Sequence, residues 1–266
     1  VWTGFDYLGE PTPWNGVSPG PVTSLGAAPN SSYFGVVETT GFPKDTYWFY
    51  RSQWNRAANT LHLVTAWDSR NMAPGNPVWI YSNAFQVELL CNGQPVGRAL
   101  RRDHVTPAGH RYHTYETESL APCCRTATGE GARGLFAAFS LTYVPGELTA
   151  LAFGEDGAPL KAQGRHRVFT PGPAAKIRLT CSCQTAWDDQ PIYGEITITD
   201  CQGNLDTTAA PLLQVGLSGP GELLGLDNGD PATTEKYQQP SVLLGPDRGR
   251  IRAWAGKALV IFRAAG

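Results

Sequence analysis

Short runs in which apolar and polar residues alternate recur along most of this chain, with turn-forming residues between them. They fall at residues 62–67, 78–81, 86–91, 135–143, 147–153, 175–181, 193–200, 212–217 and 258–263. A period of two is that of a β-strand with one buried face. Gly 30 and Pro 21 together are 51 of 266 residues, about 19% against roughly 12% in average chains. We therefore predict a mainly β protein of antiparallel β-sandwiches.

The turn signals divide these strands into two groups. Asn92-Gly93 is a strong hairpin signal after residues 86–91, because both positions of a type I′ turn need positive φ. Gly172-Pro173 marks a boundary, and we expect turns at Gln202-Gly203 and a hairpin at Asn228-Gly229. The predicted domains are a sandwich over residues 58–171, with a polar insertion at about 101–130, and an immunoglobulin-like sandwich over 172–266.

Residues 1–57 differ from the rest and read as strand, long loop and helix. The loop at 10–32 is rich in Pro, Gly, Ser and Asn, and loops of that length in compact proteins are usually functional. Residues 44–55 carry Tyr47, Tyr50 and Trp54 three and four positions apart, the spacing of one helical stripe.

Charge and hydropathy exclude several classes of protein. The net charge is −2, which lacks the basic footprint of a nucleic-acid binder, and no run of 18 apolar residues predicts a membrane-spanning helix. The chain starts at Val1 and its one methionine is Met72, so we expect an excerpt of a longer protein. A periplasmic or secreted location and a cytoplasmic one both stay open.

Nine segments, in order along nearly the whole chain, resemble the C-terminal part of bacterial β-galactosidases of glycoside hydrolase family 2. These segments are residues 1–13 (VWTGFDYLGEPTP), 32–37, 41–45, 50–54, 78–83, 87–89, 145–148, 218–221 and 226–230.

The resemblance implies that residues 1–57 are the eighth strand, loop and helix of a (β/α)₈ barrel that precedes the two sandwiches. It also implies a parent enzyme that cleaves a β-galactoside or other glycan with retention. Retaining enzymes use two carboxyls about 5–5.5 Å apart, and the family's two glutamates lie upstream of Val1. We therefore expect no catalytic residue in this chain, and no activity from it alone.

The same resemblance points to a sugar-binding wall at Trp2, Asp6, Glu10, Trp14 and Asn15. The indole of Trp2 would stack on a galactose ring, the carboxylates of Asp6 and Glu10 would accept hydroxyl hydrogen bonds, and Trp14 with Asn15 would form a rim. The alternatives are a barrel-core Trp2, carboxylates that stabilise a turn, and a Trp14 packed under its own loop. Lys44 and Asp45 are expected at a helix start or in a surface ion pair.

We predict neither a metal nor a cofactor. His104, His110 and His113 lack the further ligands of a zinc site and indicate a solvated polar loop, and residues 227–230 resemble a calcium loop only weakly. Cys91 is expected to be a buried thiol. The disulfide state of Cys123, Cys124, Cys181, Cys183 and Cys201 stays open.

A different class of function is a stand-alone carbohydrate-binding or adhesion module. Trp67, Trp79, Trp187 and Trp254 could stack on glycans, although Trp67 and Trp79 lie in strands where an inward position is the default. A lone barrel strand cannot satisfy its backbone groups. We therefore expect residues 1–8 to fray, to mediate self-association or to pack on the first sandwich.

Overall fold

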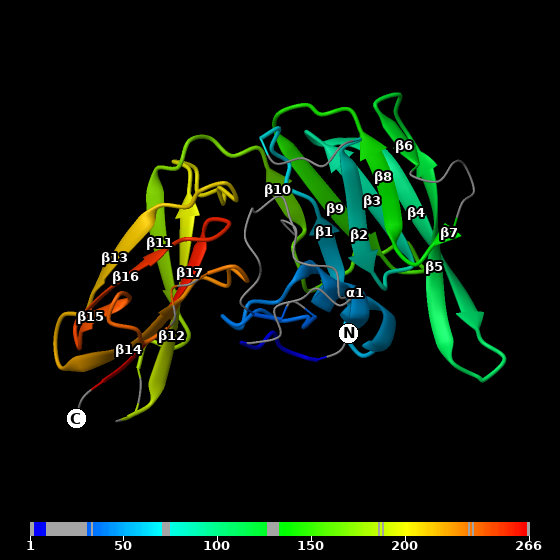
Figure 1. Ribbon diagram of the computed structural model, residues 1–266. Helices are drawn as coiled ribbons and strands as arrows, with labels where there is room; N and C mark the ends of the chain where they lie inside the picture. The colour runs from blue at the N-terminus through cyan, green and yellow to red at the C-terminus, as the bar shows by residue number, and fades with distance from the viewer. Residues whose placement is uncertain are drawn as a thin grey trace, which may run out of the picture. The chain divides into compact units, whose positions relative to one another are not determined.

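The computed structural model describes residues 3–8, 31–32, 34–70, 75–126, 133–185, 187, 189–233, 235 and 237–264. These residues form antiparallel β-sheets and a single helix, α1 (Asp45–Trp54), as Figure 1 shows. The mainly β prediction is confirmed. The chain divides into two compact units, one of residues 44–170 and one that combines residues 1–43 with 171–266. The predicted division into 1–57, 58–171 and 172–266 follows the domain boundaries that the family resemblance implies, and it stays a prediction.

The unit of residues 44–170 contains two antiparallel sheets that share one core. The first sheet has the order β1 (Leu61–Val64), β2 (Pro77–Ser82), β8 (Ala137–Leu141) and β6 (Cys124–Thr126). The second has the order β10 (Arg167–Phe169), β9 (Glu147–Phe153), β3 (Gln86–Cys91), β4 (Gln94–Val105), β5 (Arg111–Ser119) and β7 (Arg133–Gly134).

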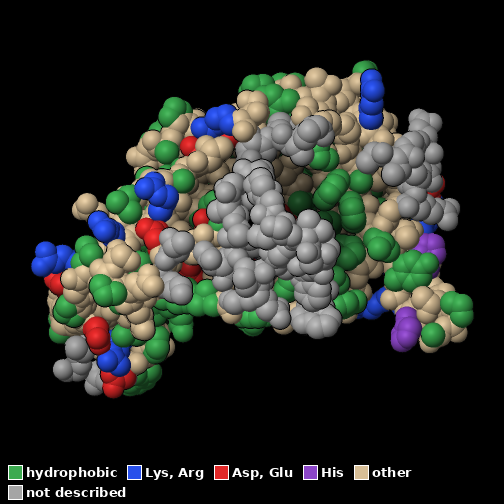
Figure 2. Space-filling model, in the orientation of Figure 1, with side chains coloured by type: hydrophobic (Ala, Val, Ile, Leu, Met, Phe, Trp, Pro, Cys, Tyr) green, Lys and Arg blue, Asp and Glu red, His purple; other side chains and the backbone are tan. Residues whose placement is uncertain are grey.

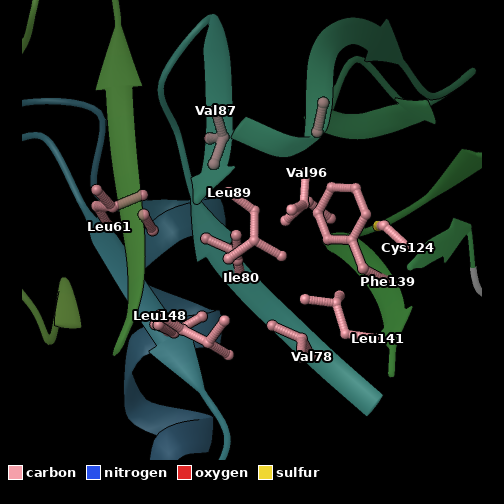
Figure 3. Packing of buried hydrophobic residues seen from close by; sticks show 14 of the residues in the cluster. Leu61, Val78, Ile80, Val87, Leu89, Val96, Cys124, Phe139, Leu141 and Leu148 are labelled. Carbon is pink, nitrogen blue, oxygen red and sulfur yellow. The ribbon is translucent and has the colours of Figure 1, made fainter. Parts of the chain in front are cut away.

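Alternate residues from both sheets fill the core of this sandwich. Figure 3 shows side chains from β2, β3 and β8, among them Ile80, Leu89 and Phe139, converging between the sheets. Gly97 of β4 lies under the Phe139 ring, where an added Cβ would be 2.6 Å from a ring carbon. The period-two pattern therefore located these strands and predicted that each has one buried face.

The chain reverses between β3 and β4 as the sequence predicts. Asn92 and Gly93 have φ angles of 49° and 78°, the positive values of a type I′ turn. The predicted insertion at 101–130 is different, because much of it is strand: β4 and β5 pair from Gly97–Ser119 to Val105–Arg111. Most residues in the outer part of this hairpin are polar, so it lacks the regular apolar alternation that reveals a strand.

The predicted helix is confirmed as α1. It starts two residues after Pro43, carries Asp45 in its first turn and packs on the first sandwich with Ser52 and Gln53 buried. Asp45 Oδ1 lies 2.6 Å from the Nε2 atom of His62, and the Trp48 ring stacks on the same imidazole at 5.1 Å. These contacts attach the helix to β1.

The second sandwich also has two antiparallel sheets around a shared core. One sheet has the order β11 (Lys176–Cys181), β12 (Pro191–Thr199), β17 (Lys257–Ala264) and β14 (Gly221–Asp227), and the other β13 (Leu212–Gly216), β16 (Arg248–Arg252) and β15 (Leu243–Gly245). The core includes Ile196, Leu226, Val242 and Ile251. The predicted turn at Gln202-Gly203 is present, but Asn228-Gly229 is a turn after β14 and joins no hairpin, since the next strand starts at Leu243.

The described N-terminal residues belong to the same compact unit as the second sandwich. They form isolated bridges and no continuous strand, with Phe5 paired to Val37 and Leu8 to Ser31. The Ser31 amide donates to the Pro231 carbonyl at 3.2 Å. Phe5 remains 63% exposed, which leaves its apolar ring available for a neighbour.

The two strand tryptophans have different surroundings. Trp67 is 1% exposed, and its indole N–H donates to the Val144 carbonyl at 2.8 Å, so its predicted core position is confirmed. Trp79 is 38% exposed, and its ring contacts Phe136. The prediction that Trp79 points inward is therefore wrong, because Val78 and Ile80 occupy the buried face of β2. Within the described ranges, no helix has the length and apolarity needed to cross a bilayer.

Candidate functional site

The N-terminal segment, residues 3–8 and 34–43, contains one of the five predicted sugar-binding residues. Asp6 is described, whereas Trp2, Glu10, Trp14 and Asn15 lie outside the described residues. Asp6 Oδ1 accepts a 2.9 Å hydrogen bond from the Gly35 amide, and the Asp6 amide donates to the Val37 carbonyl at 2.9 Å. The carboxylate therefore joins two passes of the segment, and its role toward a sugar stays a prediction.

Gly35 is needed for this close approach. A Cβ at that position would lie 2.4 Å from both the Asp6 nitrogen and the Phe5 carbonyl carbon, so any side chain would push the two passes apart.

The turn after β14 holds the N-terminal segment onto the second sandwich. The Asp227 side chain is buried, and its Oδ2 accepts a 2.8 Å hydrogen bond from the Thr39 hydroxyl. Its Oδ1 accepts from the amides of Asn228 and Gly229 at 2.7 and 3.2 Å. Burial raises the pKa of Asp227 although these donors oppose the shift.

A small cavity lies where this turn meets the N-terminal segment. Carboxylates and apolar side chains line it together, among them Leu8, Asp227, Asp230, Glu235 and Tyr237. Burial raises the pKa values of Asp230 and Tyr237. The Asp230 carboxylate accepts a hydrogen bond from the Ala232 amide at 2.9 Å, as in a hydrogen-bonded loop.

Residues 227–230 resemble a calcium loop only weakly, and their side-chain oxygens accept hydrogen bonds within the protein. The Asp227 and Asp230 oxygens accept hydrogen bonds from N–H and O–H groups, and Asn228 Oδ1 accepts from the Asp230 amide at 3.0 Å. Across the described part of the chain, no three His, Cys, Asp or Glu side chains come together as metal ligands would.

Contacts with β17 hold the turn at residues 38–42. The Glu38 amide donates to the Phe42 carbonyl at 2.9 Å, and the Lys257 ammonium lies 4.9 Å from the centre of the Phe42 ring. The same ammonium donates to Glu195 at 3.0 Å. A cation between a ring and a carboxylate ties the segment to the sheet.

The three histidines of the β4–β5 region lie in different surroundings. Figure 2 shows histidine side chains at the surface, and His110 is exposed at the hairpin end. His104 stacks on Tyr112 at 4.9 Å. His113 is 4% exposed, with Nε2 2.9 Å from the Ser82 carbonyl oxygen, so its predicted place in a solvated loop is wrong. Burial lowers the pKa of His113.

The described cysteines are all free thiols. The buried thiol expected at Cys91 is a free thiol that is partly buried and packs against the first core. Cys124 is 3% exposed instead, and burial raises its pKa to about 11.

Two family models match the chain. The model described as glycoside hydrolase family 2 C-terminal domain 5 covers residues 177–266, and a domain of unknown function, DUF4982, covers residues 75–161. The matched ranges fall in the second and first sandwich respectively.

The chain is also similar to longer curated proteins. Beta-galactosidase BoGH2A of Bacteroides ovatus is 32% identical over 271 residues, which is all of this chain and 25% of that protein. A protein of Formosa agariphila named Putative beta-glucuronidase is 38% identical over 99 residues, 36% of this chain and 9% of that protein. The chain thus spans about a quarter of the length of the first relative and less of the second.

Solved structures share the fold. A beta-glycosidase from Bacteroides vulgatus aligns with a TM-score of 0.66 at 24% identity, over 98% of this chain and 27% of that one. A family 2 member from Bacteroides cellulosilyticus aligns with a TM-score of 0.68 at 19% identity, over 99% and 32%. These structures show the fold. The sequence matches show that residues 177–266 carry a C-terminal domain of glycoside hydrolase family 2, and that the whole chain is similar to the C-terminal region of an enzyme of that family.

Proposed function

We propose that this chain is the non-catalytic C-terminal portion of a retaining glycosidase that cleaves β-galactosides. The observation that carries the proposal is the similarity to Beta-galactosidase BoGH2A over the whole chain. In this proposal residues 1–57 complete a (β/α)₈ barrel and the two sandwiches support it. The acid/base and nucleophile glutamates belong to the upstream barrel, where double displacement takes place.

The N-terminal segment would supply one wall of the sugar subsite. Trp2 offers an indole face for the apolar side of the ring, while Asp6 and Glu10 offer carboxylate acceptors and Trp14 with Asn15 offer a rim. The hydrogen bond between Asp6 and Gly35 supports this role, because it orients the segment that leads into Trp2 on one side and Glu10 on the other.

Hydrolysis of a chromogenic β-galactoside tests the division of labour. The purified 266-residue chain should release no product, and a longer polypeptide with the upstream barrel should be active. In that polypeptide, Trp2→Ala should lower kcat/KM by about tenfold to a hundredfold, equal to about 1.4–2.7 kcal/mol of transition-state binding. Trp187→Ala is the control, because Trp187 is 85% exposed in the second sandwich. Turnover by the short chain would contradict the proposal.

A β-glucuronide is the second candidate substrate. It is favoured by the Formosa agariphila match, which is the higher in identity but covers 36% of this chain. The two candidates are separated by assaying the longer polypeptide on p-nitrophenyl β-galactoside and p-nitrophenyl β-glucuronide in parallel, and comparing kcat/KM.

The stand-alone glycan-binding module remains the alternative from another class. It predicts glycan-array binding that survives deletion of residues 1–57 and is lost in Trp187→Ala. Self-association through the N-terminal segment would be detected by light scattering across a concentration series, with Phe5→Ser reducing it because that ring is exposed.

A further inference from the structure

The outer face of the three-stranded sheet in the second sandwich carries a row of arginines. Along β16, Gly249 and Ile251 face the core, while Arg248, Arg250 and Arg252 are exposed on the opposite face. Successive outward residues of a strand are about 6.6–6.8 Å apart. The three guanidinium groups therefore follow one line across roughly 13 Å of surface.

No acidic residue faces this row from the neighbouring strand. The register partners on β13 are Leu212 for Arg252, Gln214 for Arg250 and Gly216 for Arg248. On the other side, β15 places Gly245 opposite Arg248. Like charges on one sheet face repel, so a row without cross-strand carboxylates costs folding free energy.

Several basic strand residues of the other sheets are neutralised, although Arg178 of β11 lies opposite Thr197. Five of them lie beside a carboxylate from a paired strand, in the pairs Arg98–Glu118, Arg102–Glu116, Arg167–Glu147, Lys257–Glu195 and Arg263–Glu222. The row on β16 departs from this pattern, although the chain as a whole has more acidic than basic residues.

Within the part of the chain that the structure describes, the contacts of the row use few of its donors. Arg250 Nε donates to the Ser241 carbonyl at 3.1 Å and Arg252 Nη1 to the Ala210 carbonyl at 3.0 Å. Arg248 is 76% exposed, and Asp247 Oδ1 lies 3.6 Å from its Nε. Glu235 accepts from the Arg252 backbone amide. A guanidinium has five N–H donors, so each retains several for a ligand.

Apolar and amide groups border the arginines. Leu212 and Leu244 are 45% and 57% exposed, and with Gln214, Arg248 and Arg250 they line an open hollow of about 530 Å³. An aliphatic side chain can contact the C–H face of a sugar ring, an amide can bind a hydroxyl, and a guanidinium binds a carboxylate or sulfate through two parallel hydrogen bonds.

We propose that this arginine face, formed by Arg248, Arg250 and Arg252 with Leu212, Gln214 and Leu244, binds an anionic glycan. The acidic groups are uronate carboxylates or sulfate esters spaced along the sugar chain. A glycan is the favoured polyanion because residues 177–266 carry a C-terminal domain of a glycoside hydrolase family. Binding of single-stranded nucleic acid without sequence preference uses aromatic stacking, and the residues that line the hollow include no aromatic ring. The site is separate from the sugar subsite proposed above and does not depend on it.

Affinity electrophoresis of the 266-residue chain tests the proposal with matched pairs of polymers. We expect retardation by polygalacturonate but not by its methyl ester, or by dextran sulfate but not by dextran. Retardation by polygalacturonate alone would identify uronates as the ligand, and retardation by dextran sulfate alone would identify sulfate esters. Retardation by both would show that the site recognises the anionic charge they share. Binding should weaken as salt rises, because the contacts are ionic.

Single substitutions locate the site. Arg250→Gln and Arg248→Gln should each weaken binding about tenfold, equal to about 1.4 kcal/mol, and Arg250→Lys should restore part of it because the charge remains without the fork. Arg178→Gln is the control, because Arg178 is an exposed β11 arginine of the same sandwich. Unchanged melting temperatures exclude misfolding. Three results would each overturn the proposal. The first is equal binding by Arg250→Gln and the control, and the second is no retardation by either acidic polymer. The third is tighter binding of single-stranded DNA through the same arginines.

Discussion

The Thr39 hydroxyl donates a 2.8 Å hydrogen bond to the buried Asp227 carboxylate and joins two residues that are 188 positions apart in the chain. Through this contact the N-terminal segment reaches the turn after β14. A hydrogen bond to a buried charged group contributes about 1.5–3 kcal/mol.

Thr39→Val should therefore lower the free energy of unfolding by about 1.5–3 kcal/mol, because the isosteric side chain leaves one carboxylate oxygen without its donor. Urea denaturation followed by tryptophan fluorescence measures the change. Thr180→Val, at an exposed position of β11 in the same compact unit, should change it by less than about 0.5 kcal/mol. Equal effects of the two substitutions would show that the contact contributes nothing.

Asp200 should give the second sandwich an acid-sensitive component of stability. Burial alone would raise its pKa, but hydrogen bonds from the amides of Gly172, Gln202 and Asn204, and from the Asn204 side chain, lower the pKa to about 2 from 3.8. A carboxylate whose folded pKa is depressed stabilises the fold above its unfolded pKa, and this contribution is lost as pH falls toward the folded value.

Asp200→Asn should cost about 1–3 kcal/mol at pH 7, since an amide N–H would then face N–H donors. The difference from the wild type should shrink between about pH 4 and pH 2. Urea unfolding at several pH values measures it, with the exposed Asp247→Asn as the control. A difference that stays constant down to pH 2 would contradict the assigned cause.

Gly97→Ala should destabilise the first sandwich by about 1–3 kcal/mol, because the new methyl group would overlap the Phe139 ring. Combining it with Phe139→Leu should cost less than the sum of the two single substitutions, since the smaller side chain admits the methyl group. Gly216→Ala serves as the control, because a Cβ there would meet nothing within 4 Å. Additive costs in the double-mutant cycle would rule out the overlap.

Cys124 should react more slowly with a thiol reagent than Cys201 does in the folded chain. Burial raises the pKa of Cys124 to about 11, so only about a thousandth of it is thiolate at pH 8, whereas Cys201 is exposed. Mass spectrometry of tryptic peptides after brief labelling gives the order of modification. Equal rates of modification for the two thiols in the folded chain would contradict this prediction.

Local patterns in the sequence were sufficient for several elements of the fold. Alternation located strands such as β3 and β12, Asn92-Gly93 located a turn, and the spacing of Tyr47, Tyr50 and Trp54 located α1. Each signal depends on neighbours within a few residues, where backbone geometry alone determines which side chains share a face. Similarity along the chain added the family, which composition and spacing could not have identified.

Other features depend on residues far apart in sequence, and only the tertiary structure decided them. Trp79 is half-exposed because Val78 and Ile80 take the buried face, and His113 is buried because Gln53 and Ser82 reach it from other elements. The alternation in β16 indicates that its three arginines share a face, but not that Leu212, Gln214 and Gly216 are their neighbours. Long-range packing sets the register of the strands. The register in turn determines whether a charged side chain has an opposite charge beside it, and on β16 it leaves the arginines without a carboxylate on β13.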